Sequence, residues 1–267
     1  MMRSPARWAG ASRGGPRRED DPAITLSEEA GVRSLHFGSP WVQGAMRIAR
    51  PYAIEIDYVR DMMAWLLFLA PPERILQLGL GAAALTKYCW HRHRGSQVTA
   101  VERSEAVIAS ARRDFALPAD DARLKVVHAD AGEFVARPSQ RSRYGVIQVD
   151  LYDRLARGPV IDSLAFYRRC RSALAPSGVL VVNLFGEHDS YQRSIERIGQ
   201  VFEGRLLALP PVPAGNVVLL AFQGPPLRVA WAALRRRAGE LERAGLPARR
   251  WLDALRGQQG RFAEFAI

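Results

Sequence analysis

The chain has 267 residues and a formal net charge of +11, and 48% of its residues are apolar. This length is enough for one large domain with a small appendage, and since no run of about 18 consecutive apolar residues occurs, we expect no membrane span. The arginine excess could attract nucleic acid, but no basic run is interleaved with aromatic residues, so we expect a solvated Arg-rich surface without a nucleic-acid partner.

The first residues and the two cysteines bear on the compartment. Residues 1–22 are rich in Arg, Gly, Ser and Pro and lack the apolar stretch of a signal peptide, so we expect a disordered basic tail. Cys89 and Cys170 both fall in expected helices. This placement argues against a disulfide framework and favours a reducing, cytoplasmic location.

Residues 23–50 have the pattern of a small β domain. Short strand-like segments are separated by Gly, Pro and Glu residues, and they are Ala23–Leu26, Val32–Phe37 and Trp41–Gln43. The period then changes, and residues 54–69 become solidly apolar toward their end. We expect a largely buried helix there, stopped by Pro71 and Pro72.

Strands and helices alternate from residue 74 onward. We expect strands at 74–78, 97–101, 124–128, 145–149 and 179–184, and helices at 82–93, 104–115, 131–136, 161–174 and 190–201. This alternation predicts an α/β fold with a doubly wound, mostly parallel, Rossmann-like sheet of the methyltransferase type over residues 51–225. Segments 205–208 and 217–222 indicate a terminal antiparallel hairpin. Residues 226–267 form an expected C-terminal helical extension, with one or two surface helices at 228–256.

The segment after the first strand of this series is Gly79-Leu80-Gly81. Open α/β sheets bind ligands at the carboxyl ends of their strands. Small residues there let the backbone approach a ligand, and the next helix offers free N–H groups at its N-terminus. The loop is therefore a candidate nucleoside site, although a Gly-x-Gly pair also serves simple strand-to-helix packing.

Acidic residues follow the next two strands. Glu102 lies 21 residues after Gly81, which is about the separation of an acid that holds ribose hydroxyls. The alternative is a surface Glu beside Arg103. Asp130 can accept a hydrogen bond from an adenine amino group or cap the following helix, and both roles are compatible if one oxygen caps.

Two carboxylates, Asp150 and Asp153, end the fourth strand. Such a pair can bind a cationic amine and take its proton, and loop capping is the alternative role. Tyr152 stands between them and is a candidate for lining an acceptor pocket or for loop packing. Glycines and acids thus fall at four successive strand ends, and this register favours a nucleoside site more strongly than any one motif.

These residues resemble the spermidine synthase family, the aminopropyltransferases, from about Val32 to Phe222. The resemblance implies that an S-adenosyl donor lies over the glycine loop and contacts Gln43, Gly79, Leu80, Gly81, Glu102, Asp130 and Ala131. It implies that Asp150 deprotonates the attacking amine and that Asp153 holds the charge of that amine. The residues expected to line the substrate site are Tyr58, Tyr152 and Val212, with a buried core position as the alternative for Tyr58.

The chain departs from the family pattern at four positions. Ala82 stands where the family has an Asp that pairs with the primary amine of the donor. Val212 replaces a Tyr of the polyamine site, Arg154 replaces a Pro after the second catalytic Asp, and Ser104 replaces an Asp near the ribose acid. Intact S-adenosylmethionine carries a carboxylate that an acid at position 82 would repel, so Ala82 removes that repulsion.

The resemblance implies a transferase that moves an aminopropyl group from decarboxylated S-adenosylmethionine to a small-molecule amine such as putrescine. The alternatives are methyl transfer from S-adenosylmethionine to an amine or protein acceptor, a non-catalytic adenosyl- or polyamine-binding protein, and a nucleic-acid-binding protein. We expect the adenosyl compound to be a co-substrate, with no bound metal or prosthetic group, and the protein to be a homodimer. His91 and His93 point in different directions on their helix, which argues against a metal site there.

Overall fold

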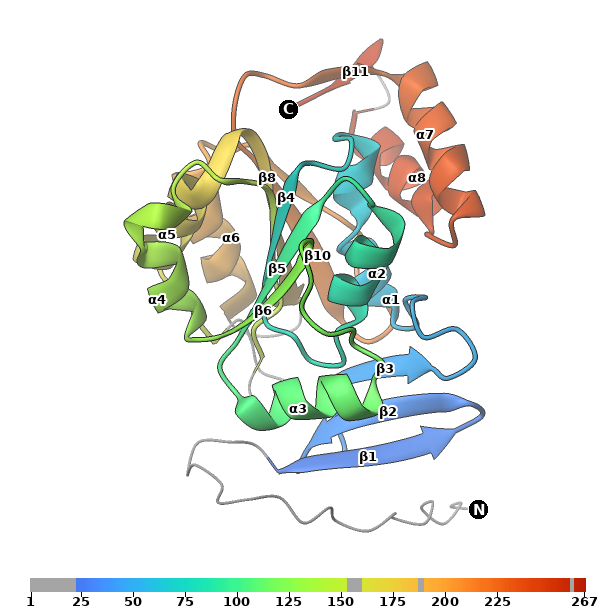
Figure 1. Cartoon of the computed structure of the whole chain (residues 1–267). Coiled ribbons are helices and arrows are strands. Elements are labelled where there is room, and N and C mark those ends of the chain that lie inside the picture. Colours follow the sequence, from blue (N-terminus) through green and yellow to red (C-terminus); the bar gives the residue numbers. More distant parts are fainter. Residues whose placement is uncertain (1–22, 153–159, 187–189, 260–261) are drawn as a thin grey trace.

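The central element is a sheet of seven strands in the order β6-β5-β4-β7-β8-β10-β9, seen in a computed structural model that describes residues 23–152, 160–186, 190–259 and 262–267 (Figure 1). The strands are β4 (Arg74–Leu78), β5 (Gln97–Glu102), β6 (Leu124–His128), β7 (Tyr144–Val149), β8 (Leu174–Phe185), β9 (Leu206–Ala208) and β10 (Asn216–Phe222). Strands β4 to β8 pair in parallel, and β10 runs antiparallel to both β8 and β9. The predicted doubly wound sheet with a terminal antiparallel pair is confirmed.

Helices cover both faces of this sheet, and each face has its own apolar core. One core includes residues of α2 (Ala84–Arg92), α3 (Glu105–Asp114), α7 (Trp231–Arg243) and α8 (Ala248–Gln259). The other includes residues of α4 (Ala131–Ala136), α5 (Leu164–Ala173) and α6 (Ser190–Val201). Cys89 and Cys170 are buried as free thiols in different cores. No helix in the described part of the chain is long and apolar enough to cross a membrane.

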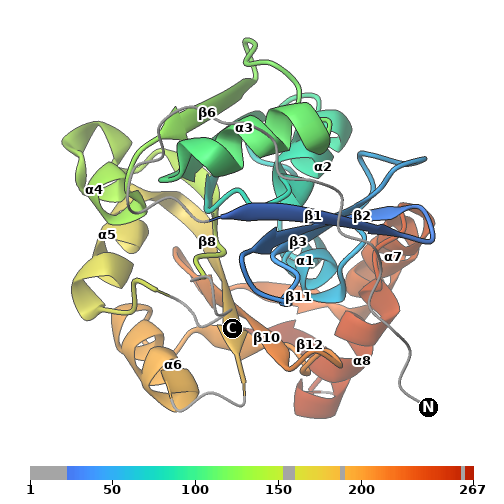
Figure 2. The same cartoon turned by 90° about the horizontal axis from the view of Figure 1, so that it is seen from below.

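A small antiparallel sheet lies beneath the carboxyl ends of the central strands, next to α3 (Figures 1 and 2). It consists of β1 (Ile24–Glu29), β2 (Val32–Phe37) and β3 (Gly44–Arg47). The strand expected at Trp41–Gln43 is wrong, because β3 begins at Gly44. His36 Nδ1 hydrogen-bonds to the carbonyl of Trp41 at 3.1 Å across the turn at residues 38–43, and the N–H of Gln43 donates to Leu35 O at 2.8 Å, just before the first paired residue of β3, Gly44.

The segment expected as one helix over 54–69 is instead a short helix α1 (Asp57–Asp61) followed by a 3-10 turn, η1 (Ala64–Leu67). All four residues of η1 are buried, so packing on every side decides the backbone path in place of helical periodicity. Side chains from other elements donate to two carbonyls of this segment. Gln148 donates to Met62 O at 2.9 Å and Arg237 donates to Leu67 O at 2.9 Å.

Three other boundaries differ from expectation. Helix α2 begins at Ala84 because Ala83 is left-handed, with φ of 57°. Helix α5 begins at Leu164, where Ser163 caps it, and β8 extends back to Leu174.

The C-terminal segment is integrated into the molecule. Helices α7 and α8 were expected on the surface, but Leu234, Trp251 and Leu255 are fully buried in the same core as Trp65 of η1. A two-stranded pair, β11 (Arg228–Ala230) and β12 (Glu264–Ala266), brings the last described residues back beside the start of the segment. Helices α7 and α8 therefore form one wall of the core on that face of the sheet.

Candidate active site

The glycine loop lies between the carboxyl end of β7 and the small sheet. Gly79 has φ of 96°, and a Cβ atom there would lie 2.1 Å from the carbonyl oxygen of Asp150. A Cβ at Gly81 would lie 3.1 Å from the carbonyl oxygen of Gln43. The fold therefore brings the predicted residues Gln43, Gly79, Gly81 and Asp150 together, with backbone packed on backbone where a side chain has no room.

The Glu102 carboxylate lies against this loop. Its Oε2 accepts a hydrogen bond from the N–H of Leu80 at 3.1 Å, and its Oε1 accepts from the N–H of Ser104 at 2.9 Å. Burial raises the pKa of Glu102, and hydrogen bonds from backbone N–H groups oppose the rise. Glu102 is thus half-buried and tied to the glycine loop, unlike a surface Glu beside Arg103, and its contact with ribose hydroxyls stays a prediction.

Asp130 caps α4 at the next strand end. Its Oδ1 accepts from the N–H of Glu133 at 2.9 Å, and the residue is exposed, whereas Ala131 after it is buried. The capping role is confirmed, and it uses one carboxylate oxygen. Contact of the other oxygen with an adenine ring stays a prediction.

The Asp150 carboxylate accepts hydrogen bonds from two side chains. Asn183 Nδ2 donates to its Oδ1 at 2.9 Å, and the Tyr58 hydroxyl donates to its Oδ2 at 3.5 Å. Burial raises the pKa of the Asp150 carboxyl to about 6, although both hydrogen bonds act in the opposite direction. Burial and the Asp150 charge hold the pKa of Tyr58 well above its ordinary value, so Tyr58 stays protonated and is the donor in this pair.

Two amide side chains support the carboxylate from the antiparallel end of the sheet. Asn216 Nδ2 donates to Asn183 Oδ1 at 3.1 Å, which leaves the Asn183 amide group to face Asp150. Sequence reasoning missed Asn216. The signal was present, since Asn216 is the polar residue at the start of the apolar strand β10, directly after Gly215.

The remaining candidates have different surroundings. Tyr152 follows Asp150 by two residues, and burial and the Asp150 charge raise the pKa of its phenol. Val212 is buried in the turn before β10, and its N–H donates to Asn216 O at 2.9 Å. Asp153 and Arg154 lie outside the described residues. Among the described residues, no three His, Cys, Asp or Glu side chains are grouped so as to hold a metal ion.

The sequence matches a known family over most of this site. A family model described as "Spermine/spermidine synthase domain" matches residues 58–220. A polyamine aminopropyltransferase of Neisseria meningitidis serogroup A is 38% identical to the chain over 246 residues, which cover 90% of this chain and 92% of that protein. The chain belongs to the spermine/spermidine synthase family.

Solved structures agree with this family at the level of the fold. A probable spermidine synthase from Corynebacterium glutamicum superposes with a TM-score of 0.66 at 22% identity, covering 79% of this chain and 81% of its own. Human methyltransferase-like protein 13, solved in complex with SAH, superposes with a TM-score of 0.63 at 24% identity, covering 71% of this chain and 92% of its own. Spermine/spermidine synthases and methyltransferases thus share this architecture.

The departure at Ala82 has a structural setting in this member of the spermine/spermidine synthase family. Ala82 is 2% exposed and packs with Leu35, Met46 and Phe115. A Cβ atom at Gly44 would lie 2.6 Å from Ala82 Cβ. Strand β3 therefore lies directly on position 82, and no space is left there for a longer acidic side chain.

Proposed function

We propose that the chain transfers an aminopropyl group from decarboxylated S-adenosylmethionine to a small amine such as putrescine. The observation that carries the proposal is the Asp150 carboxyl at the end of β7, whose pKa burial raises to about 6 within a spermine/spermidine synthase family member. A base of this pKa is ionised at neutral pH and accepts a proton more readily than an ordinary aspartate.

The proposed step balances without a further reactant. The lone pair of the acceptor nitrogen attacks the carbon bonded to the sulfonium sulfur, and the carbon–sulfur bond breaks. The sulfur keeps the bonding electrons and leaves as the thioether methylthioadenosine, while the proton of the amine passes to Asp150. Alignment of the two substrates supplies much of the acceleration in such a displacement.

The glycine loop is the proposed seat of the donor. Glu102 is positioned to exchange its contact with the Leu80 N–H for the ribose hydroxyls, and Asp130 and Ala131 offer the α4 N-terminus to the adenine ring. Gln43 would close the donor from the small sheet. For the acceptor, we propose that Tyr58, Tyr152 and Val212 line the pocket and that Asp153 holds the second charge of the amine.

The assembly and location of the protein are part of the same proposal. Family membership supports a homodimer that works in the cytoplasm on soluble substrates. Sedimentation of the purified protein tests the dimer, and a monomer at assay concentration would contradict it.

Methyl transfer from intact S-adenosylmethionine is the second candidate, and one observation favours it. Position 82 has no carboxylate for the primary amine of the decarboxylated donor, and the packing of Gly44 on Ala82 leaves none a place. The carboxylate of the intact compound would meet no repulsion there.

Calorimetric titration with the two donors separates the candidates. We expect decarboxylated S-adenosylmethionine to bind more tightly than the intact compound, and putrescine to be converted to spermidine in its presence. Tighter binding of the intact compound, together with methylation of an amine, would overturn the aminopropyl assignment. Asp150→Asn serves as a control, since it removes the base and keeps the shape of the site, so turnover should be lost while nucleoside affinity changes little.

A further inference from the structure

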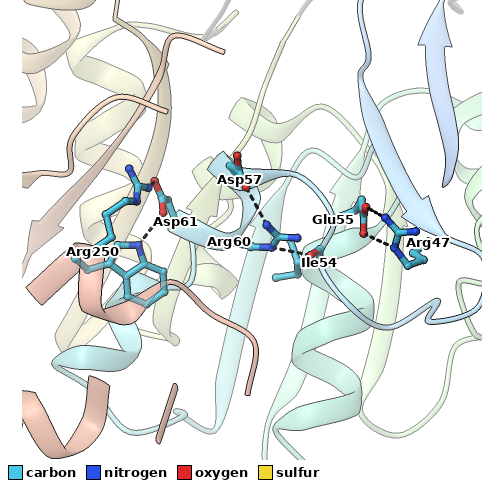
Figure 3. Close-up of polar contacts among 8 residues, drawn as sticks. Arg47, Ile54, Glu55, Asp57, Arg60, Asp61 and Arg250 are labelled. Carbon is cyan, nitrogen blue, oxygen red and sulfur yellow. Dashed lines mark hydrogen bonds and ion pairs between the residues drawn. The ribbon is translucent and has the colours of Figure 1, made fainter. Parts of the chain in front are cut away.

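Helix α8 reaches the segment that carries Tyr58 through one buried carboxylate, Asp61 (Figure 3). The Arg250 guanidinium forms an ion pair with Asp61 Oδ2, and Trp251 Nε1 donates to Asp61 Oδ1 at 2.7 Å. We infer that Arg250 is a positioning residue that holds Tyr58 against the Asp150 carboxylate through Asp61. The inference rests on the proposed function for its catalytic meaning and on contacts alone for its geometry.

The contact is one that the fold cannot relax easily. Asp61 and Trp251 are 0% exposed, and a carboxylate in such a place destabilises the folded state unless donors surround it. Burial raises the pKa of Asp61, and the hydrogen bonds from Arg250 and Trp251 act against that rise. Removing the guanidinium would therefore leave Asp61 with a single donor. A shift of α1 that exposes the carboxylate to water would then lower the free energy.

Asp61 and Tyr58 are three residues apart on α1, so they lie on neighbouring positions of one turn. The carbonyl of Tyr58 accepts from the N–H of Met62 at 2.9 Å, which makes this turn a stiff unit. The far side of the turn is held by Gln148 of β7, which donates to Met62 O at 2.9 Å. The strand that leads to Asp150 and the helix α8 thus fix α1 from two directions.

Other contacts limit how α1 can move. Arg47 of β3 forms an ion pair with Glu55, and Arg60 donates to the carbonyl of Ile54 at 2.9 Å (Figure 3). The start of the segment is therefore anchored, and the end at Asp61 is the part that depends on α8. The Tyr58 hydroxyl lies 3.5 Å from Asp150 Oδ2, at the limit of a hydrogen bond, so a small rotation of α1 is enough to break the contact.

Arg250 also joins α1 to the turn that precedes β10. Its Nη1 lies 3.5 Å from the carbonyl oxygen of Pro210, two residues before Val212. Val212 in turn donates its N–H to Asn216, whose side chain supports Asn183 and through it Asp150. The Arg250 guanidinium thereby contacts α1, which carries the Tyr58 donor, and the turn before β10, whose Asn216 orients the Asn183 donor.

A double-mutant cycle tests the inference. Arg250→Met is expected to lower kcat for aminopropyl transfer about tenfold with a smaller change in the KM for the donor, and Tyr58→Phe is expected to have a similar effect. In the Tyr58→Phe background, Arg250→Met should cost less than about twofold, because the contact it maintains is already gone. Arg250→Lys, which keeps the charge, should recover part of the rate. If the fold-losses in kcat of the two single variants multiplied in the double variant, the inference would be overturned.

Arg237→Met is the matched control. Arg237 is also an arginine of the C-terminal helices that donates to the preceding segment, but its partner is Leu67 O of η1, away from Tyr58. We expect its loss to lower thermal stability and to leave kcat near that of the wild type. Equal losses of kcat in both variants would reduce Arg250 to a general structural role and reject the inference.

An activity-independent measurement separates this inference from the proposed function. The groups that face the Asp150 carboxylate are Tyr58, Asn183 and Tyr152, and Tyr58 lowers its pKa by donating to it. Titration of the Asp150 carboxyl by carbon NMR should therefore give a higher midpoint in Arg250→Met than in the wild type or in Arg237→Met. An unchanged midpoint rejects the inference whatever the enzyme does, whereas a wild-type enzyme without aminopropyl transfer rejects only the function.

Discussion

At the scale of a single residue, burial and hydrogen bonding act in opposite directions on the pKa of the Asp150 carboxyl. Its two donors, Asn183 and Tyr58, favour the ionised form, while burial disfavours it and prevails. The amide of Asn183 is itself oriented by Asn216, so the carboxylate has a fixed direction as well as a raised pKa. Such a group is suited to removing a proton from an amine that binds beside it.

The pH dependence of the reaction follows from this pKa. Asp150 must be ionised to accept a proton, so kcat/KM for the donor should rise with pH through about 6 and level off above it. Tyr58→Phe removes a donor to the ionised form and should move the inflection upward. Steady-state rates from pH 5 to 8 measure both, and a flat profile in the wild type would argue against Asp150 as the base.

The same residue has a predictable effect on stability. The carboxyl has a pKa of 3.8 as its ordinary value and about 6 in the folded protein, so the folded state binds the proton more tightly. Its contribution to stability is therefore complete below about pH 4 and is lost as the pH rises through 6. Asp150→Asn cannot ionise, so at pH 8 its free energy of unfolding should exceed that of the wild type by up to about 3 kcal/mol. Urea unfolding measures this difference.

The comparison at low pH is the control for that prediction. At pH 4 both proteins carry a neutral group at position 150, and the difference in the free energy of unfolding should nearly vanish. A stability difference that is the same at pH 4 and pH 8 would show that the substitution acts through packing.

At the scale of elements, most strands and helices were predictable from local sequence, because their caps and hydrophobic patterns lie within their own residues. Ser104 and Ser163 cap α3 and α5, and strands β4 and β7 are mostly apolar and buried, as expected for strands covered on both faces. The break between α1 and η1 was not predictable, since the donors that satisfy its carbonyls come from residues 86 and 170 positions away in the sequence. Strand β3 was misplaced for a similar reason, because its position depends on packing against Ala82.

The docking of β3 on the glycine loop predicts a test at this scale. Gly44→Ala would put a methyl group 2.6 Å from Ala82 Cβ and 2.8 Å from Ala82 N, and neither neighbour is a flexible side-chain end. The loop and β3 should separate, and the affinity for methylthioadenosine should fall by at least about tenfold, or 1.4 kcal/mol.

Gly31→Ala is the control from the same small sheet. Gly31 has φ of 74° and no atom within 4 Å of an added Cβ, so its substitution strains a turn without touching the loop. Calorimetry should give wild-type affinity for this variant. Equal losses of affinity in both variants would mean that the stability of the small sheet matters, and its contact with Ala82 does not.

At the scale of the whole molecule, the sheet joins two cores to which distant parts of the chain contribute. The core that contains Trp65 also contains Leu234, Trp251 and Leu255 from the C-terminal helices. The candidate site was largely predictable because parallel strands bring their carboxyl ends to one edge, so residues far apart in sequence meet by topology alone. The contributions of Asn216 and Arg250 could not be predicted. They depend on contacts between side chains far apart in the sequence, which hydrophobic periodicity does not reveal.

Because one sheet separates both cores, and the C-terminal helices belong to one of them, we expect the whole chain to unfold cooperatively. Leu255→Ala in α8 and Ile198→Ala in α6 remove fully buried side chains from opposite faces of the sheet, and each should cost about 2–5 kcal/mol. Both should shift one common urea transition, with tryptophan fluorescence and far-UV circular dichroism giving the same midpoint. A separate early transition in Leu255→Ala alone would show that residues 226–267 unfold as an independent domain.

The packing of Gly44 on Ala82 limits which side chains position 82 can accept. Position 44 already has the smallest residue, so a longer side chain at position 82 cannot be accommodated by trimming its neighbour. An acid there would require the turn at 38–43 to change its length or path, so that β3 shifts its register. A single substitution at position 82 therefore places no carboxylate beside the glycine loop unless the backbone of β3 also moves.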